Sequence, residues 1–233
     1  MEDLLINSIY VATEGEGVLI GSPQAFIRFQ GCKLACKNCD SKETWSFQHK
    51  NFRSIEETLA KLEDLDAPKR VSITGGDPLD PFHRKGVMKL VGALKNKGFW
   101  INIEATGAEV PHDIFDLLDF ISIDFKTPST GVLGNIEVIK QMASQYIDRF
   151  QVKSVIENNL DFDYVVKAKN TLEQKIGKIN FPWVLTPSFN TGEDFPKERV
   201  LEIIKRNENL KENAFRVIVQ QHKWLYGSIK RHI

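Results

Sequence analysis

The sequence predicts an α/β fold built around a mainly parallel β-sheet. Short apolar segments alternate along the chain with helical stretches, a pattern typical of strands joined by crossover helices. Polar or glycine-rich residues follow the apolar segments, as expected where the ends of parallel strands form a shared rim. The 233 residues are 42% hydrophobic and 27% charged, which suits a soluble protein with a sizeable core. We expect residues 1–233 to form a single domain.

Seven segments are predicted to be strands, because each is a short apolar or alternating run bounded by turn residues. They span residues 24–30, 70–74, 99–104, 120–125, 150–156, 182–185 and 215–219. A capping box formed by Ser54 and Glu57 predicts a helix that begins at residue 55 and ends near residue 65. A second helix is expected from about Arg84 to Gly98, the glycine that follows its end.

The charge balance gives no reason to expect nucleic acid or a membrane as a partner. The chain carries 31 Lys and Arg and 31 Asp and Glu residues, so no excess of positive charge would attract either. The N-terminus is acidic, and no apolar run follows it that could serve as a signal peptide or a membrane span. We therefore expect a cytoplasmic protein.

The three cysteines form the strongest motif in the chain. Cys32, Cys36 and Cys39 have the spacing C-x3-C-x2-C, and such clustering in a reducing compartment indicates a metal or cluster site rather than disulfides. A [4Fe–4S] cluster held by three thiolates keeps one iron without a protein ligand, and that iron can bind a substrate or cofactor. The alternatives are a zinc site with His49 as fourth ligand and three buried structural thiols.

A second motif, Gly75-Gly76-Asp77-Pro78, directly follows the predicted strand at 70–74. Together with the cysteine spacing it resembles the radical S-adenosylmethionine superfamily, which more often has Gly-Gly-Glu-Pro at this point. The resemblance implies that the three cysteines bind a [4Fe–4S] cluster, that the cluster cleaves S-adenosylmethionine to a 5′-deoxyadenosyl radical, and that Gly75, Gly76 and Asp77 lie at the methionyl amino group. It also implies a partial, TIM-like βα barrel of the radical S-adenosylmethionine type.

Further segments narrow the resemblance to one family. Thr13-Glu14-Gly15-Glu16-Gly17, Cys39-Asp40-Ser41 and Gln221-His222-Lys223 are similar to segments of the 7-carboxy-7-deazaguanine synthases, over about residues 6–227. Membership implies radical ring contraction of 6-carboxy-5,6,7,8-tetrahydropterin, begun by removal of hydrogen from C6 and completed by loss of ammonia. It further implies Mg2+ as a cofactor, a flavodoxin-like electron donor, a homodimer and a place in queuosine or other deazapurine biosynthesis.

The same resemblance assigns roles to single residues. Arg28 would bind the substrate carboxylate through its planar fork, and Ser41 would be a ligand of Mg2+. The other residues expected at the substrate are Thr13, Glu14, Gly15, Glu16, Thr74 and His222. Those expected at S-adenosylmethionine, besides the glycine motif, are Glu104, Asp124, Phe125, Lys126, Thr186, Pro187, Ser188 and Phe189.

Glu14 departs from the family, which has Gln before Gly-Glu-Gly. A carboxylate only accepts hydrogen bonds, whereas a carboxamide also donates them, so we expect Glu14 to accept from the N–H groups on the guanidine side of the pterin. Two other functions stay open at this level. A radical activase acting on a glycine of a partner protein would need a docking surface instead of Arg28 and Ser41, and a non-catalytic zinc- or cluster-binding module would be separated by metal and sulfide analysis.

Overall fold

Nine strands form one sheet in the part of the chain that the computed structural model describes, residues 4–47, 52–190 and 192–227. From one edge to the other the order is β3-β1-β2-β4-β5-β6-β7-β8-β9. β1 pairs antiparallel with β2 and β3, and every other neighbouring pair is parallel. The strands are β1 (Leu4–Thr13), β2 (Pro23–Phe29), β3 (Phe52–Arg53), β4 (Arg70–Gly75), β5 (Trp100–Ala105), β6 (Phe120–Asp124), β7 (Phe150–Ile156), β8 (Trp183–Pro187) and β9 (Arg216–Val217).

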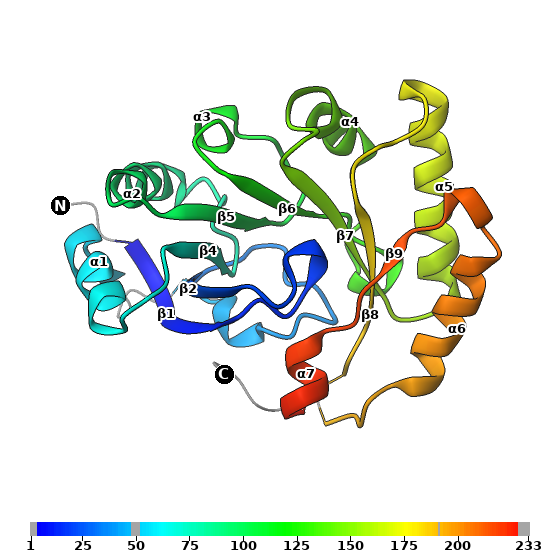
Figure 1. Ribbon diagram of the computed structural model, residues 1–233, viewed down its shortest axis with the longest axis horizontal. Helices are drawn as coiled ribbons and strands as arrows, with labels where there is room; N and C mark the ends of the chain where they lie inside the picture. Colours follow the sequence, from blue (N-terminus) through cyan, green and yellow to red (C-terminus); the bar gives the residue numbers. More distant parts are fainter. Residues whose placement is uncertain (1–3, 48–51, 191, 228–233) are drawn as a thin grey trace.

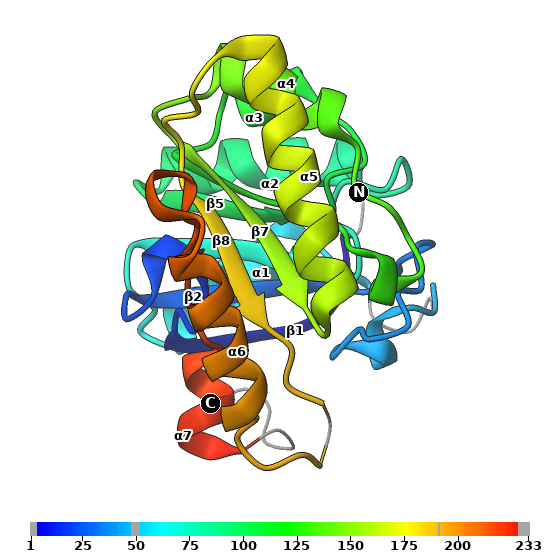
Figure 2. The same cartoon turned by 90° about the vertical axis from the view of Figure 1, so that its right-hand side faces the viewer.

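Helices follow the strands and lie along the outer side of the curved sheet (Figure 1). Seen from the side, α5 and α6 lie next to each other in front of β7 and β8 (Figure 2). The helices are α1 (Ile55–Asp64), α2 (Arg84–Asn96), α3 (His112–Phe115), α4 (Ile136–Gln145), α5 (Asn159–Ile176), α6 (Lys197–Glu208) and α7 (Gln221–Tyr226). The edge strands β3 and β9 do not pair with each other, so the sheet does not close into a full barrel. The fold is the incomplete, mainly parallel βα barrel that the sequence predicts.

Alternation along the central strands gives the sheet one apolar and one polar face, since successive side chains of a strand point to opposite sides. The apolar set is fully buried and includes Ile73, Ile103 and Ile123. On α2, the residues that join this core recur at helical spacing, as expected for a helix packed on a sheet. They are Val87, Leu90, Val91 and Leu94.

The polar face carries a chain of hydrogen bonds that ties β4, β5, β6 and β7 together. Gln151 Nε2 donates to Ser122 Oγ at 2.8 Å, and Ser122 Oγ donates to Asn102 Oδ1 at 3.3 Å. Asn102 Nδ2 donates to Ser72 Oγ at 2.8 Å and to Glu104 Oε1 at 2.9 Å. Buried polar groups need such partners, so the chain fixes the strands that carry the functional residues.

The local signals in the sequence are confirmed. Ser54 Oγ accepts from Glu57 N at 3.1 Å while Glu57 Oε2 accepts from Ser54 N at 2.7 Å, and Gly98 follows α2 with φ of +76°. The last strand is shorter than the predicted 215–219, because only Arg216 and Val217 pair with β8 before the chain turns into α7. No helix in the described ranges has the length and apolar character to cross a membrane.

Candidate active site

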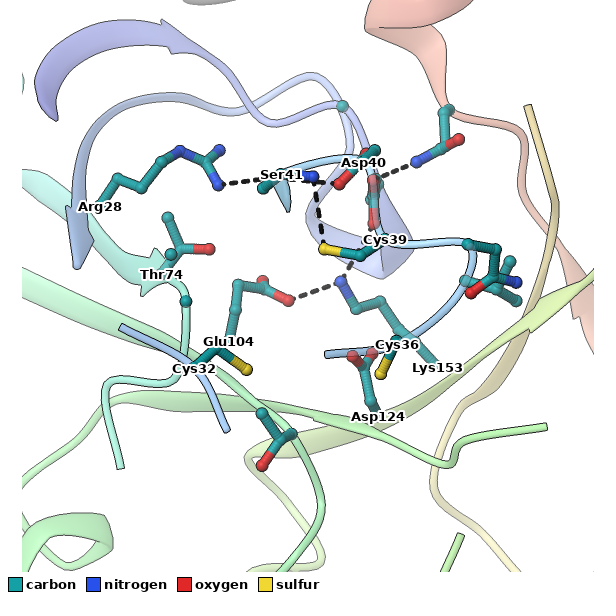
Figure 3. Close-up of a pocket in the computed structure, with 18 of the residues that line it drawn as sticks. Arg28, Cys32, Cys36, Cys39, Asp40, Ser41, Thr74, Glu104, Asp124 and Lys153 are labelled. Atoms are coloured by element: carbon teal, nitrogen blue, oxygen red, sulfur yellow. Dashed lines mark hydrogen bonds and ion pairs between the residues drawn. The ribbon is translucent and has the colours of Figure 1, made fainter. Parts of the chain in front are cut away.

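A cavity of about 320 Å³ lies at the carboxyl ends of the parallel strands, between the strand ends and the loop that carries the cysteines (Figure 3). The structure brings nearly all residues predicted for the site to this cavity. The exceptions are Asp77, Thr186 and Pro187, which do not line it. Asp77 Oδ1 instead accepts a hydrogen bond from Leu79 N at 3.1 Å, so its side chain stabilises the turn after β4.

The three thiols are free and all line the cavity. Backbone hydrogen bonds from Gly31 N to Thr44 O at 2.6 Å and from Lys37 N to Thr130 O at 2.9 Å hold their loop in place. Among the described residues, no three His, Cys, Asp or Glu side chains could hold a metal ion between them. A cubane cluster does not require three side chains close enough to bind one metal ion, because each thiolate binds a different iron. His49, the fourth ligand of the zinc alternative, lies outside the described residues.

The Gly75-Gly76 turn lies directly against the start of the cysteine loop. A Cβ on Gly76 would come within 2.3 Å of Gly31 O, and Asp77 N donates to Gly31 O at 2.8 Å. Only glycine permits this approach. At the end of β8, the buried Ser188 Oγ has no hydrogen-bond partner in the described structure. Free thiols, a bare backbone turn and an unsatisfied hydroxyl around one cavity fit a cluster with a polar ligand beside it.

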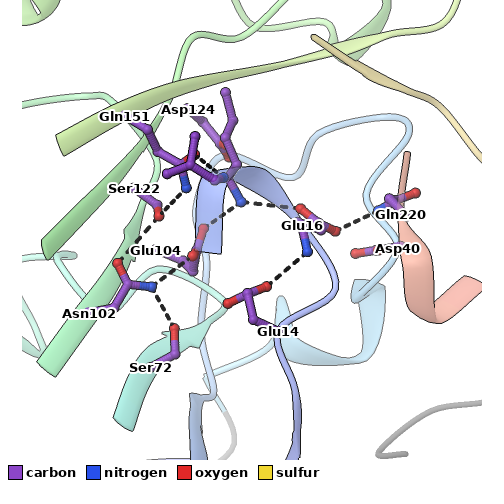
Figure 4. A network of polar contacts seen from close by, with 12 residues as sticks. Glu14, Glu16, Asp40, Ser72, Asn102, Glu104, Ser122, Asp124, Gln151 and Gln220 are labelled. Atoms are coloured by element: carbon purple, nitrogen blue, oxygen red, sulfur yellow. Dashed lines mark hydrogen bonds and ion pairs between the residues drawn. The ribbon is translucent and has the colours of Figure 1, made fainter. Parts of the chain in front are cut away.

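A buried lysine to which the sequence analysis gave no role connects two of the site's carboxylates; Figure 3 labels the lysine, and Figure 4 labels the two carboxylates. Lys153 Nζ on β7 lies 2.5 Å from Glu104 Oε2 and 3.2 Å from Glu16 Oε2. Gln220 Nε2 also donates to Glu16 Oε1 at 2.7 Å. Burial opposes the charge on Lys153, but Glu104 and Glu16 outweigh it and hold its pKa well above the ordinary value. Burial likewise opposes the charge on Glu16, but Lys153 lowers its pKa to about 2.

Arg28 and Ser41 lie side by side at the cavity (Figure 3). Arg28 Nη1 donates to Ser41 Oγ at 3.1 Å and Nη2 donates to Tyr10 Oη at 3.0 Å. Ser41 Oγ in turn donates to Asp40 Oδ1 at 3.1 Å, and Lys223 Nζ lies 2.8 Å from Asp40 Oδ2. Partial desolvation at the cavity favours the neutral form of Asp40, whose side chain is 47% exposed, but Lys223 outweighs it and keeps the pKa of Asp40 well below its usual range.

The C-terminal helix completes the wall of the cavity. The ring of His222 packs on Gly15 so closely that a Cβ there would lie 2.1 Å from Nδ1, and Gln221 N donates to Gly15 O at 2.9 Å. On the opposite side, Lys126 Nζ lies 2.7 Å from Asp124 Oδ2. The tail is therefore part of the site, as the predicted role of His222 requires.

The charged or amide residues of the cavity that were not assigned a role from the sequence include Asp40, Lys153, Gln220 and Lys223. Asp40 and Lys223 stand within the motifs quoted above, and Lys153 had a signal of its own as the single charged residue in the otherwise mainly apolar segment FQVKSVI. A lysine in a buried strand needs a partner charge, and this need could have marked it.

The chain is similar in sequence to known proteins. The profile of the 4Fe-4S single cluster domain matches residues 13–122. The 7-carboxy-7-deazaguanine synthase of Pyrobaculum aerophilum is 34% identical over 54% of the chain and 57% of that protein. The Chlorobaculum tepidum synthase is 32% identical over 68% of the chain and 70% of its own length. The Aquifex aeolicus synthase is 29% identical over 94% of the chain and 92% of its own length.

Structural similarity agrees with these relatives at the level of the fold. The crystal structure of QueE from Escherichia coli superposes with a TM-score of 0.67 at 21% sequence identity, and the match covers 94% of this chain and 95% of that one. The chain belongs to the 7-carboxy-7-deazaguanine synthase family.

Proposed function

We propose that the chain converts 6-carboxy-5,6,7,8-tetrahydropterin to 7-carboxy-7-deazaguanine with release of ammonia. The observation that carries the proposal is that three free thiols and Arg28 line one cavity. A group that generates a radical and a group that binds a carboxylate must face the same substrate in such a reaction. The family of the chain supports the same substrate.

The cofactors would lie on the side of the cavity formed by the cysteine loop and the ends of β4, β6 and β8. Cys32, Cys36 and Cys39 would hold the [4Fe–4S] cluster, and S-adenosylmethionine would lie against the Gly75-Gly76 turn. When bound, the two supply the radical that removes a hydrogen atom from the substrate. Lys126, held by Asp124 at 2.7 Å, offers a positive charge to the cofactor's carboxylate, and the unpartnered Ser188 hydroxyl offers it a hydrogen bond.

The substrate would lie on the side formed by Arg28, Glu14 and His222. Two of the five N–H groups of Arg28 are used by Ser41 and Tyr10, so the remaining three can bind a carboxylate. The bonds already made fix the plane of the guanidinium before substrate arrives, which reduces the entropy cost of binding. Arg28 would thus orient the pterin with its reacting carbon toward the cofactors.

Mg2+ would bind at Ser41, beside the substrate carboxylate. Ser41 Oγ and the Asp40 carboxylate lie 3.1 Å apart at the cavity, and oxygen ligands of this kind suit Mg2+, which completes its shell with substrate oxygens and water. Ser41→Ala should weaken the stimulation of product formation by Mg2+ and leave cleavage of S-adenosylmethionine unchanged. An unchanged response to Mg2+ would return Ser41 to a role in orienting Arg28.

The family also supports a flavodoxin-like electron donor, a homodimer and action in the cytoplasm, with a product used for queuosine or another deazapurine. The direct test is anaerobic incubation of the iron-reconstituted protein with S-adenosylmethionine, dithionite, Mg2+ and the carboxy-tetrahydropterin. We expect 7-carboxy-7-deazaguanine by mass spectrometry from the wild type and none from Cys36→Ala. Cleavage of S-adenosylmethionine without any change in the pterin would contradict the proposed substrate.

A further inference from the structure

Glu14 is a buried carboxyl group on the wall of the cavity. It follows β1 directly, and its side chain is 5% exposed. Its Oε2 accepts from Gln24 Nε2 at 2.6 Å and its Oε1 accepts from Glu16 N at 3.1 Å. Both donors are neutral, so no cation touches Glu14 in the described structure (Figure 4).

The charges around Glu14 do not balance. Glu16 faces it from its own loop, Glu104 from β5 and Lys153 from β7, which gives one buried and two partly buried carboxyl groups and one ammonium group. Lys153 contacts Glu16 and Glu104 directly. If all three carboxyl groups were ionised, the single ammonium group would leave two negative charges uncompensated. Such charge away from water costs free energy, and a carboxyl group usually avoids the cost by binding a proton.

The other charged groups nearby do not supply the missing cation. Arg70 on β4 acts on Glu14, but its guanidinium stacks on the ring of Trp100 at 3.6 Å. His222 on α7 packs against Gly15, and burial lowers its pKa below the ordinary value, so it is neutral at pH 7. The remaining cations of the cavity wall do not contact Glu14 either. Arg28 donates to Ser41 and Tyr10, and Lys126 and Lys223 are paired with Asp124 and Asp40.

Hydrogen bonding identifies Glu14 as the carboxyl group that binds the proton. Glu16 is held ionised by Lys153 and Gln220. Glu104 contacts Lys153 and Asn102, so Glu14 is the one carboxyl group of the three that no cation contacts in the described structure. Burial and then the charge of Glu104 raise the pKa of Glu14 to about 7.

We propose that Glu14 carries a proton near neutral pH and donates it in a hydrogen bond to the ring of the bound pterin. This inference rests on the proposed function for the identity of the ring. A neutral carboxyl group offers one donor and one acceptor, as a carboxamide does, whereas a carboxylate offers acceptors alone. Glu14 therefore recognises a ring edge on which an N–H group neighbours an acceptor, such as N3–H beside the C4 carbonyl oxygen. An ionised Glu14 would instead bind a ring edge that presents two N–H donors.

The proton itself is tested without substrate. Infrared spectra of the reconstituted protein are recorded between pH 6 and pH 8 for wild type, Glu14→Gln and Glu198→Gln, in which the same change is made at an exposed position of α6. We expect a protonated-carboxyl absorption that disappears as the pH rises through about 7, in wild type and Glu198→Gln only. The same absorption in Glu14→Gln, or none in wild type at pH 6, would overturn the proposal.

The donated hydrogen bond is tested by anaerobic calorimetry of pterin binding across the same pH range. The pterin also titrates, so the affinity of wild type is divided by that of Glu14→Gln at each pH. This ratio should fall roughly tenfold per pH unit above the midpoint of the Glu14 titration. A ratio that does not change with pH would overturn the donor role of Glu14. Failure of both proteins to bind the pterin at any pH would instead overturn the proposed substrate, and the infrared titration would still decide the protonation.

Discussion

Lys153→Met should destabilise the protein by about 3–5 kcal/mol, because removing one partner of a buried ion pair leaves the other charges uncompensated. The side chain of Lys153 is 10% exposed, and those of Glu16 and Glu104 are 24% and 19% exposed. Methionine has nearly the same length and fills the space of the lysine stem, so the change removes mainly the charge.

An exposed pair with the same geometry supplies the control. Lys97 Nζ lies 3.2 Å from Glu63 Oε1, the same separation as Lys153 from Glu16, but these side chains are 52% and 67% exposed. At that separation the attraction is about 1.3 kcal/mol with the dielectric constant of water and about 5 kcal/mol with an effective value of 20. Screening and side-chain entropy reduce exposed pairs further, so Lys97→Met should cost only about 0–1 kcal/mol.

Urea denaturation followed by circular dichroism, at equal cluster content, measures both losses from the shift in midpoint at constant m value. In Lys153→Met the pKa of Glu16 rises in the folded state, because burial raises it and the ammonium group that lowers it is gone. The folded variant then binds more protons than the unfolded chain above pH 4.5, and its stability falls as pH rises. The loss should therefore be larger at pH 8 than at pH 5. Equal losses for the two lysine variants, or a loss independent of pH, would refute the reasoning.

Three further changes test other parts of the site. The pKa of Glu14 is raised from 4.5 to about 7, so Glu14 should contribute about 3 kcal/mol to the free energy of unfolding. This contribution is fully present below pH 4.5 and is lost as pH rises through about 7. The urea midpoint of Glu14→Gln should not show the corresponding decrease with pH. Gly76→Ala should abolish binding of S-adenosylmethionine, measured by calorimetry, because the new methyl group would meet Gly31 O at 2.3 Å. As the control, Gly92→Ala in α2 has open space around it and should stabilise the protein by about 0.5–1 kcal/mol. Arg28→Lys should raise the KM for the pterin roughly ten- to a hundredfold without changing cleavage of S-adenosylmethionine; equal KM values would exclude Arg28 as the carboxylate-binding group.

The elements that could be predicted are those with local signals. The capping box at Ser54 and the glycine after α2 each specify a helix end within a few residues. β1 was missed because its signal is not local: Leu4, Leu5 and Ile6 are consecutive and all buried, so the strand does not alternate at its start. Its antiparallel pairing with β2 depends on the loop between them, which also carries Glu14.

The same difference between local and non-local signals holds for the residues of the site. Residues that belong to sequence motifs, such as the cysteines and Gly76, were found because a motif specifies spacing along the chain. Lys153 was missed because its importance arises only when β5, β7 and the loop after β1 meet in space. Thr186 was expected at S-adenosylmethionine from the family resemblance, but it lies within β8, and its buried hydroxyl has no hydrogen-bond partner among the described residues.

In the proposed function the cysteine loop and the substrate-binding residues serve one cavity, and transfer of deuterium tests this most directly. The reconstituted protein is incubated anaerobically with S-adenosylmethionine, dithionite, Mg2+ and the carboxy-tetrahydropterin bearing deuterium at C6. The conversion is redox-neutral, so the 5′-deoxyadenosyl group that takes the atom from C6 must return a hydrogen atom to the product radical. We therefore predict deuterium in the 5′-deoxyadenosyl group, recovered in S-adenosylmethionine and 5′-deoxyadenosine, together with 7-carboxy-7-deazaguanine and ammonia. Formation of 5′-deoxyadenosine without deuterium while the pterin remains intact would contradict the account.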